Sequence, residues 1–88
     1  MKLIISIVRD TDNDLVSRSL TNKGFRVTCV ASTGGFWRRG QSTLLIGVED
    51  EKIEEALTII RQNATKPTES DKFRTTIFVL KVDQFSQF

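Results

Sequence analysis

The order of two kinds of hydrophobic periodicity constrains the fold of this chain more than any other feature. Apolar residues recur at i, i+3, i+4 and i+7 in the segment 51–62, and these residues are Ile53, Ala56, Leu57 and Ile60. A second helix is predicted over 12–22. Strands, which have apolar residues at alternating positions, are predicted over 2–8, 25–31, 43–48 and 74–82. The chain is therefore expected to form a single domain, 1–88, with two helices set between strands.

This order of elements also restricts how the strands can be arranged. With right-handed crossovers it gives a ferredoxin-like α+β sandwich, a βαββαβ unit whose four-stranded antiparallel sheet carries both helices on one face. The run 2–8 is apolar on both faces, so it is predicted to lie centrally. Apolar strand residues occur at both parities, and they include Ile4, Val8, Val30, Leu45, Phe78 and Leu80. Two helices cover only one face of the sheet. The apolar residues on the uncovered face therefore predict a symmetric homo-oligomer that would bury them.

Capping residues stand at the ends of the predicted helices. Thr11, with Asp14 three positions on, predicts the N-cap of the first helix, and Gly24 stands where a left-handed residue ends it. The side chains expected to reach the core from this helix are Leu15, Val16 and Leu20. Asp50 is predicted to cap the second helix. The polar segment 63–72, which contains the only proline, is predicted to be a loop.

Composition excludes several classes of function. Thirteen basic and eleven acidic side chains give a net charge of +2, which is too small to indicate a DNA- or RNA-binding surface. The chain has one cysteine, Cys29, and no histidine. We therefore expect no disulfide within the chain, no metal or cofactor, and no Cys/His or Ser/His catalytic pair, which indicates a protein that is not an enzyme. Cys29 alternates with apolar neighbours and is predicted to be a buried structural thiol.

The apolar runs are short. The longest, such as 3–5 and 77–80, fall far below the roughly 20 residues that span a bilayer. The chain also leads straight into a strand-like run with no small-residue cleavage site. The sequence therefore predicts a cytoplasmic protein that does not enter membranes.

The segment 33–40 is the strongest candidate for a ligand-binding loop. It combines three glycines, two aromatic residues and two arginines, and its sequence is TGGFWRRG. Backbone freedom, stacking surface and positive charge suit an anionic, aromatic ligand such as a nucleotide. An ordinary hairpin loop with solvated charges explains the same composition. Strand alternation points Arg26 and Thr28 the same way, and a hairpin would bring Gln41 and Gly47 toward them.

Several segments together resemble the P-II-like family of cyclic di-AMP receptors. They are MKLIISIV at 1–8, GFRVT at 24–28, the Thr33 to Phe36 segment TGGF, Gly47-Val48, and IFVLKVDQFSQF at 77–88. The resemblance covers nearly the whole chain. It implies a non-enzymatic signal transduction protein and second messenger receptor, a homotrimer of ferredoxin-like subunits that bind cyclic di-AMP in the clefts between them. A downstream protein partner, not identified by the sequence, would receive the signal.

The family pattern also implies which residues contact the ligand. Carried over position by position, they are Arg26, Thr28, Gly35, Phe36, Trp37, Gln41, Gly47, Phe78 and Gln87. The chain departs from the pattern in its short 63–72 segment, at Trp37, and at Gln41, where asparagine is usual. Two alternatives follow from these departures. The first is a P-II-like protein that binds another adenine nucleotide, ATP or ADP. The second is a protein-interaction module that has lost nucleotide binding and docks through Phe36 and Trp37.

Overall fold

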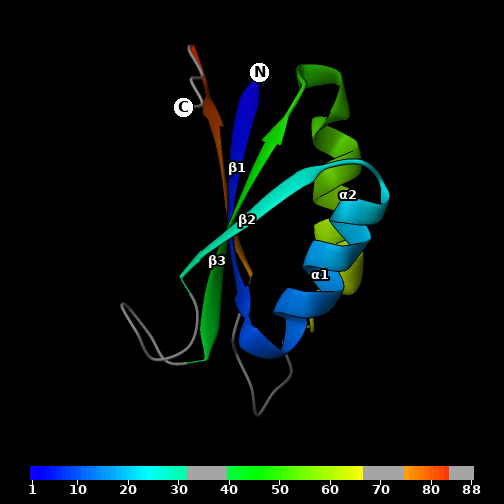
Figure 1. The fold of residues 1–88 in the computed structure, drawn as a ribbon, viewed down its shortest axis with the longest axis vertical. Coiled ribbons are helices and arrows are strands. Elements are labelled where there is room, and N and C mark those ends of the chain that lie inside the picture. The colour runs from blue at the N-terminus through cyan, green and yellow to red at the C-terminus, as the bar shows by residue number, and fades with distance from the viewer. Residues whose placement is uncertain (32–39, 67–74, 84–88) are drawn as a thin grey trace.

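A computed structural model describes residues 1–31, 40–66 and 75–83 of the chain. The elements follow the predicted order (Figure 1). They are β1 (Lys2–Arg9), α1 (Asp10–Asn22), β2 (Arg26–Ala31), β3 (Gln41–Val48), the 3-10 turn η1 (Asp50–Lys52), α2 (Ile53–Asn63) and β4 (Thr76–Lys81). The predicted α+β class is confirmed, and element boundaries differ from the predicted ones by up to two residues at most ends.

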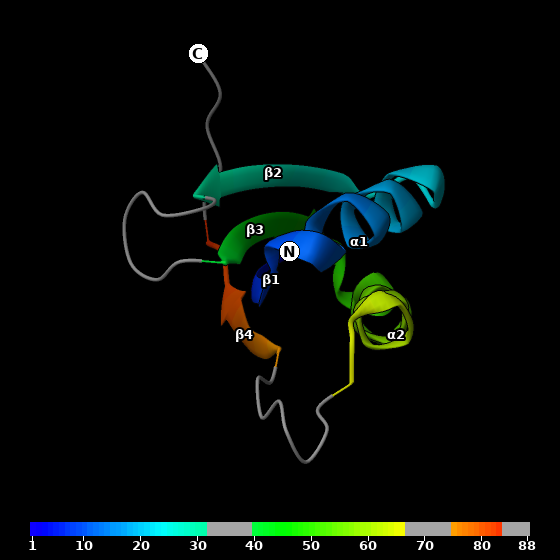
Figure 2. The ribbon, with the colours of Figure 1, turned by 90° about the horizontal axis from the view of Figure 1, so that it is seen from below.

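The four strands form one antiparallel sheet in the order β2-β3-β1-β4. Both helices lie on the same side of this sheet (Figure 2). This is the topology of the ferredoxin-like fold, in which each helical crossover skips one strand. β1 lies between β3 and β4, so the prediction of a central first strand is confirmed.

The core fills the space between the sheet and the two helices. Its buried apolar side chains are Ile4, Val8, Val16, Leu20, Phe25, Leu44, Ile46, Val48, Ala56, Leu57, Ile59 and Ile60. The predicted inward stripe of α2 is confirmed, with Ile53 partly buried against the core. The prediction for Leu15 is wrong, because this side chain is 50% exposed. Asp12, Val16 and Leu20 form the buried stripe of α1, and Leu15 lies about 100° around the helix from Val16.

Both predicted N-caps are wrong. α1 begins at Asp10 after Arg9, with no side-chain cap, so Thr11 lies inside the helix. Tertiary contacts to β3 and to Thr65 hold this first turn instead. At the second helix, a 3-10 turn begins at Asp50 without a side-chain cap. The Asp50 carboxylate lies 3.3 Å from the amino nitrogen of Met1.

The end of α1 follows the prediction. Gly24 has φ +90, the left-handed region that glycine adopts most readily. The Phe25 N–H donates to the Leu20 carbonyl at 3.1 Å and the Gly24 N–H to the Thr21 carbonyl at 2.9 Å. These two bonds are those of a Schellman motif. Phe25 and Leu20 are both buried in the core, so the turn that leads from α1 into β2 is anchored by apolar side chains at both ends.

The second half of β2 departs from the expected alternation. A β-bulge lies between Cys29 and Ala31, since Cys29 pairs with Leu44 and Ala31 with Thr43. The prediction that Cys29 is buried is wrong, because its side chain is exposed. β2 is an edge strand, and the Asn13 Nδ2 of α1 lies 3.8 Å from the exposed Cys29 Sγ.

Candidate functional site

The sheet face opposite the helices, here named the open face, carries the candidate ligand residues that the structure describes. Strand alternation and pairing place these residues in rows that cross the sheet. The first row is Arg26, Gly47, Leu3 and Leu80. The second is Thr28, Leu45, Ile5 and Phe78, the third includes Thr43, Ile7 and Thr76, and the last pairs Gln41 with Arg9.

Arg26 and Gly47 are direct cross-strand partners at one end of the open face. The Arg26 side chain is exposed, and Gly47 presents bare backbone next to it. A Cβ added at Gly47 would lie 3.0 Å from the Cε of Met1, so the backbone here is closely approached. Thr28 occupies the next row and is also exposed, which confirms that Arg26 and Thr28 share a face. The Arg26 cation and the Thr28 hydroxyl therefore lie in adjacent rows of the open face, paired with Gly47 and Leu45.

A shallow pocket of about 190 Å³ opens at this same end of the molecule. It is lined by Met1, Lys23, Gly24, Phe25, Gly47, Val48, Glu49 and Lys52. Gly47 belongs both to the pocket and to the row of Arg26. The lining contains two lysines and one glutamate, so the pocket carries a small net positive charge.

Phe78 lies on the open face but not beside Thr28. It is 51% exposed, and the second row places Leu45 and Ile5 between the two residues. Three strand spacings separate β2 from β4, or about 14 Å. Within one chain, Thr28 and Phe78 therefore lie on the same face of the sheet but at its two opposite edges.

Gln41 is likewise separated from Gly47 within one chain. β3 runs without a break in its pairing to β1 from Gln41 to Gly47, six residues along the strand, or about 20 Å. The expectation that a hairpin brings these two residues together does not hold inside a single subunit. Gln41 instead pairs with Arg9, a half-buried cation that sequence reasoning missed. Arg9 follows Ile5 and Ile7 at the same two-residue spacing, so extending the predicted first strand by one residue would have placed Arg9 on this face.

The first turn of α1 lies beside the Gln41 end of β3. The Asp10 N–H donates to the Gly40 carbonyl at 2.8 Å, and the Ser42 hydroxyl donates to the Asp10 carboxylate. The Asp12 carboxylate accepts hydrogen bonds from Thr65, from the backbone N–H at 2.8 Å and from the hydroxyl at 2.6 Å. Asp12 is only 7% exposed while Thr65 is exposed, so this contact is partly buried.

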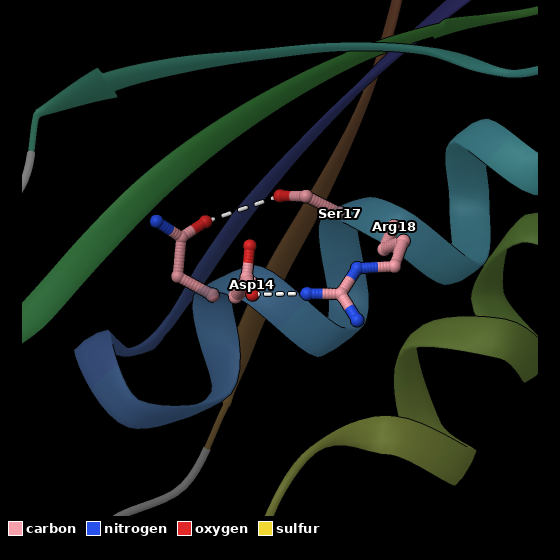
Figure 3. A network of polar contacts seen from close by, with 4 residues as sticks. Asp14, Ser17 and Arg18 are labelled. Atoms are coloured by element: carbon pink, nitrogen blue, oxygen red, sulfur yellow. Dashed lines mark hydrogen bonds and ion pairs between the residues drawn. The ribbon is translucent and has the colours of Figure 1, made fainter.

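Two side-chain contacts of α1 run along the helix itself. The Ser17 hydroxyl donates to Asn13 Oδ1 at 3.1 Å, and Arg18 forms an ion pair with Asp14 (Figure 3). Asp14 and Arg18 are exposed and stand on the helix layer, away from the open face. This pair is therefore a surface contact one helical turn long.

Four of the predicted contact residues fall outside the described residues. They are Gly35, Phe36, Trp37 and Gln87. Within the described ranges, no group of three Cys, Asp or Glu side chains could hold a metal ion. In the same ranges, no helix has the length and apolar character needed to cross a membrane.

Comparison with known proteins identifies the family. The chain is similar to a functionally unknown protein from Pediococcus pentosaceus ATCC 25745, whose crystal structure superposes with a TM-score of 0.78 at 35% sequence identity. The match covers 99% of this chain and 96% of that one. The model of the cyclic-di-AMP receptor family matches residues 1–71, which include β1, β2, β3 and both helices. The chain belongs to the cyclic-di-AMP receptor family.

Proposed function

We propose that this protein is a cyclic di-AMP receptor that transmits the signal to another protein, rather than an enzyme. The observation that carries the proposal is the family match over 1–71, a range that contains Arg26, Thr28, Gln41 and Gly47. The chemistry of the open face agrees with it. The Arg26 guanidinium can grip a phosphate of the ligand in bidentate fashion, and Thr28 can donate a hydroxyl hydrogen bond. We place this receptor in the cytoplasm as part of the same proposal.

The ligand is proposed to lie between subunits of a homotrimer. Gln41 and Gly47 stand about 20 Å apart along β3, and Phe78 lies on the strand edge opposite Thr28. One ligand can contact all of these residues only if different copies of the chain supply them. The half-buried and exposed apolar side chains of the open face, among them Leu45, Ile5 and Phe78, offer the surface on which those copies would pack.

The remaining predicted residues would complete the site. Phe36 and Trp37 supply stacking surface for adenine, worth about 1–3 kcal/mol per base. A charge-assisted hydrogen bond from Arg26 would add about 1.5–3 kcal/mol. Gly35 would offer backbone groups and Gln87 an amide from the C-terminal segment. Together with Gln41, Gly47 and Phe78, these residues form the proposed ligand-binding set.

Calorimetric titration tests the proposal. The purified protein is titrated with cyclic di-AMP, and in parallel with ATP and cyclic di-GMP, at near-physiological salt. We expect binding of cyclic di-AMP alone, with an affinity on the order of micromolar and one ligand per subunit. Preferential binding of ATP would instead support the adenine-nucleotide alternative. If none of the three nucleotides binds, the receptor proposal is rejected and the protein-interaction module is favoured.

A further inference from the structure

Asp10 contacts both neighbours of Gln41. Its backbone N–H donates to the carbonyl of Gly40 at 2.8 Å, and its carboxylate accepts a hydrogen bond from the hydroxyl of Ser42. These two bonds hold the chain immediately before and immediately after Gln41. Pairing with Arg9 fixes the same residue from the β1 side. Gln41 is therefore held by its pairing with Arg9 and by the two bonds that Asp10 makes to the residues on either side of it.

These bonds act from the side of the sheet opposite the ligand. Ser42 is buried on the helix side with only 1% of its surface exposed, and alternation places Gln41 on the open face. Asp10 therefore holds the backbone from behind while the Gln41 side chain remains available. A side chain so placed cannot touch a ligand on the open face. It can only determine where Gln41 presents its amide.

Asp12 anchors the same helical turn at a second place. Its buried carboxylate accepts two hydrogen bonds from Thr65, which follows the end of α2. Only Thr11 separates Asp12 from Asp10 in α1, so the turn cannot shift without breaking one of these sets of contacts. The turn is thus a fixed support for Gln41.

We propose that Asp10 is a positioning residue of the cyclic dinucleotide site, which acts by fixing Gln41 through Gly40 and Ser42. The inference rests on the proposed function, because Gln41 is a ligand residue only in that proposal. The amide of Gln41 can hydrogen-bond a base or a phosphate, and a bond of this kind loses strength quickly when its geometry is disturbed. Asp10 thereby sets the affinity without contacting the nucleotide.

A double-mutant cycle tests the inference. Ser42→Ala removes the side-chain bond to Asp10, and we expect it to weaken cyclic di-AMP binding by about fivefold, the cost of one misplaced hydrogen bond. In a Gln41→Ala background, the same change should have almost no further effect, because the positioned amide is already absent. If the losses of binding free energy in the two single variants add up to the loss in the double variant, Ser42 acts on the site by another route and the inference is overturned.

Ser6→Ala is the matched control. Ser6 lies on β1, pairs with Leu44, is fully buried on the same side of the sheet, and its hydroxyl has no hydrogen-bond partner in the described part of the chain. Removing this hydroxyl should leave the affinity unchanged. An equal loss in both variants would mean that any buried serine change disturbs the protein, and positioning by Asp10 would be rejected.

A ligand-free measurement separates this inference from the proposed function. If the wild-type protein fails to bind cyclic di-AMP, the receptor proposal fails, but the restraint on Gln41 can still be measured by 15N relaxation. The backbone order parameter of Gln41 should fall in Ser42→Ala and stay unchanged in Ser6→Ala. An unchanged order parameter in Ser42→Ala would refute the positioning role, whatever the ligand.

Discussion

The exposed Arg26 is the cross-strand partner of Gly47 on the open face, where its guanidinium is available to an anion. We expect Arg26→Ala to weaken cyclic di-AMP binding at least tenfold, because a charge-assisted hydrogen bond contributes about 1.5–3 kcal/mol. Calorimetry at one salt concentration measures this. Arg18→Ala is the control, since it also removes one positive charge, but from an exposed ion pair on α1. Equal affinities for both variants would remove Arg26 from the site.

Asp12 is a residue whose role is structural. Asp12→Ala should lower the free energy of unfolding by about 1.5–3 kcal/mol, because it leaves the two Thr65 donors without their charged acceptor. Asp14→Ala, two positions along the same helix, removes only an exposed pair with Arg18 and should cost about 0.3–0.5 kcal/mol. Urea denaturation at equal protein concentration compares the two variants. Similar midpoints would show that the Asp12–Thr65 contact does not support the fold.

At the scale of single elements, the junction between α1 and β2 depends on Gly24. With φ +90, this position is left-handed, and any L side chain there is strained. Gly24→Ala should therefore lower the free energy of unfolding by about 1–2 kcal/mol, although nothing within 4 Å would touch the added Cβ. Asn22→Ala, an exposed change in the last turn of the same helix, should leave stability almost unchanged. Thermal denaturation distinguishes the two, and an unaffected Gly24→Ala protein would contradict the backbone argument.

The elements could be predicted because their periodicity follows burial. The stripe of Ala56, Leu57 and Ile60 is local in sequence, and so is the left-handed position of Gly24. The helix starts could not be predicted in the same way. Asp10 and Asp12 are held by Ser42 and Thr65, which lie far along the chain, and no local pattern records such partners. Local capping signals therefore favoured Thr11 as the N-cap, while tertiary contacts placed the start of α1 two residues earlier, at Asp10.

The candidate site was predicted less completely, for a reason of geometry. Alternation correctly put Arg26 and Thr28 on one face, because residues two positions apart in a strand point to the same side of the sheet. It could not give the distance between Gln41 and Gly47, since that depends on where β3 begins. The sequence suggested a shorter strand, and the two further residues carry Gln41 to the far end of the open face.

Two of the large exposed apolar side chains in the described part of the chain, Phe78 and Leu80, lie side by side on the open face of β4. Phe78 is 51% exposed and Leu80 is 47% exposed, and in their rows they lie across from Ile5 and Leu3, which are half-buried. Contiguous apolar surface of this kind on a small protein indicates an interface. β4 is an edge strand of the sheet, so a second copy can approach it without disturbing the core.

Assembly of the proposed trimer can therefore be tested with one charged residue. Phe78→Glu places a carboxylate on the open face, where burial against another copy would leave it without a partner, so we expect the trimer to dissociate into folded monomers. Leu15→Glu is the control, because Leu15 is 50% exposed, nearly the same as Phe78, but lies on α1 on the opposite side of the sheet. Sedimentation equilibrium gives the masses, and circular dichroism checks that each variant is folded. A Phe78→Glu protein that remains trimeric would place the interface elsewhere, and dissociation of both variants would show that it is not confined to the open face.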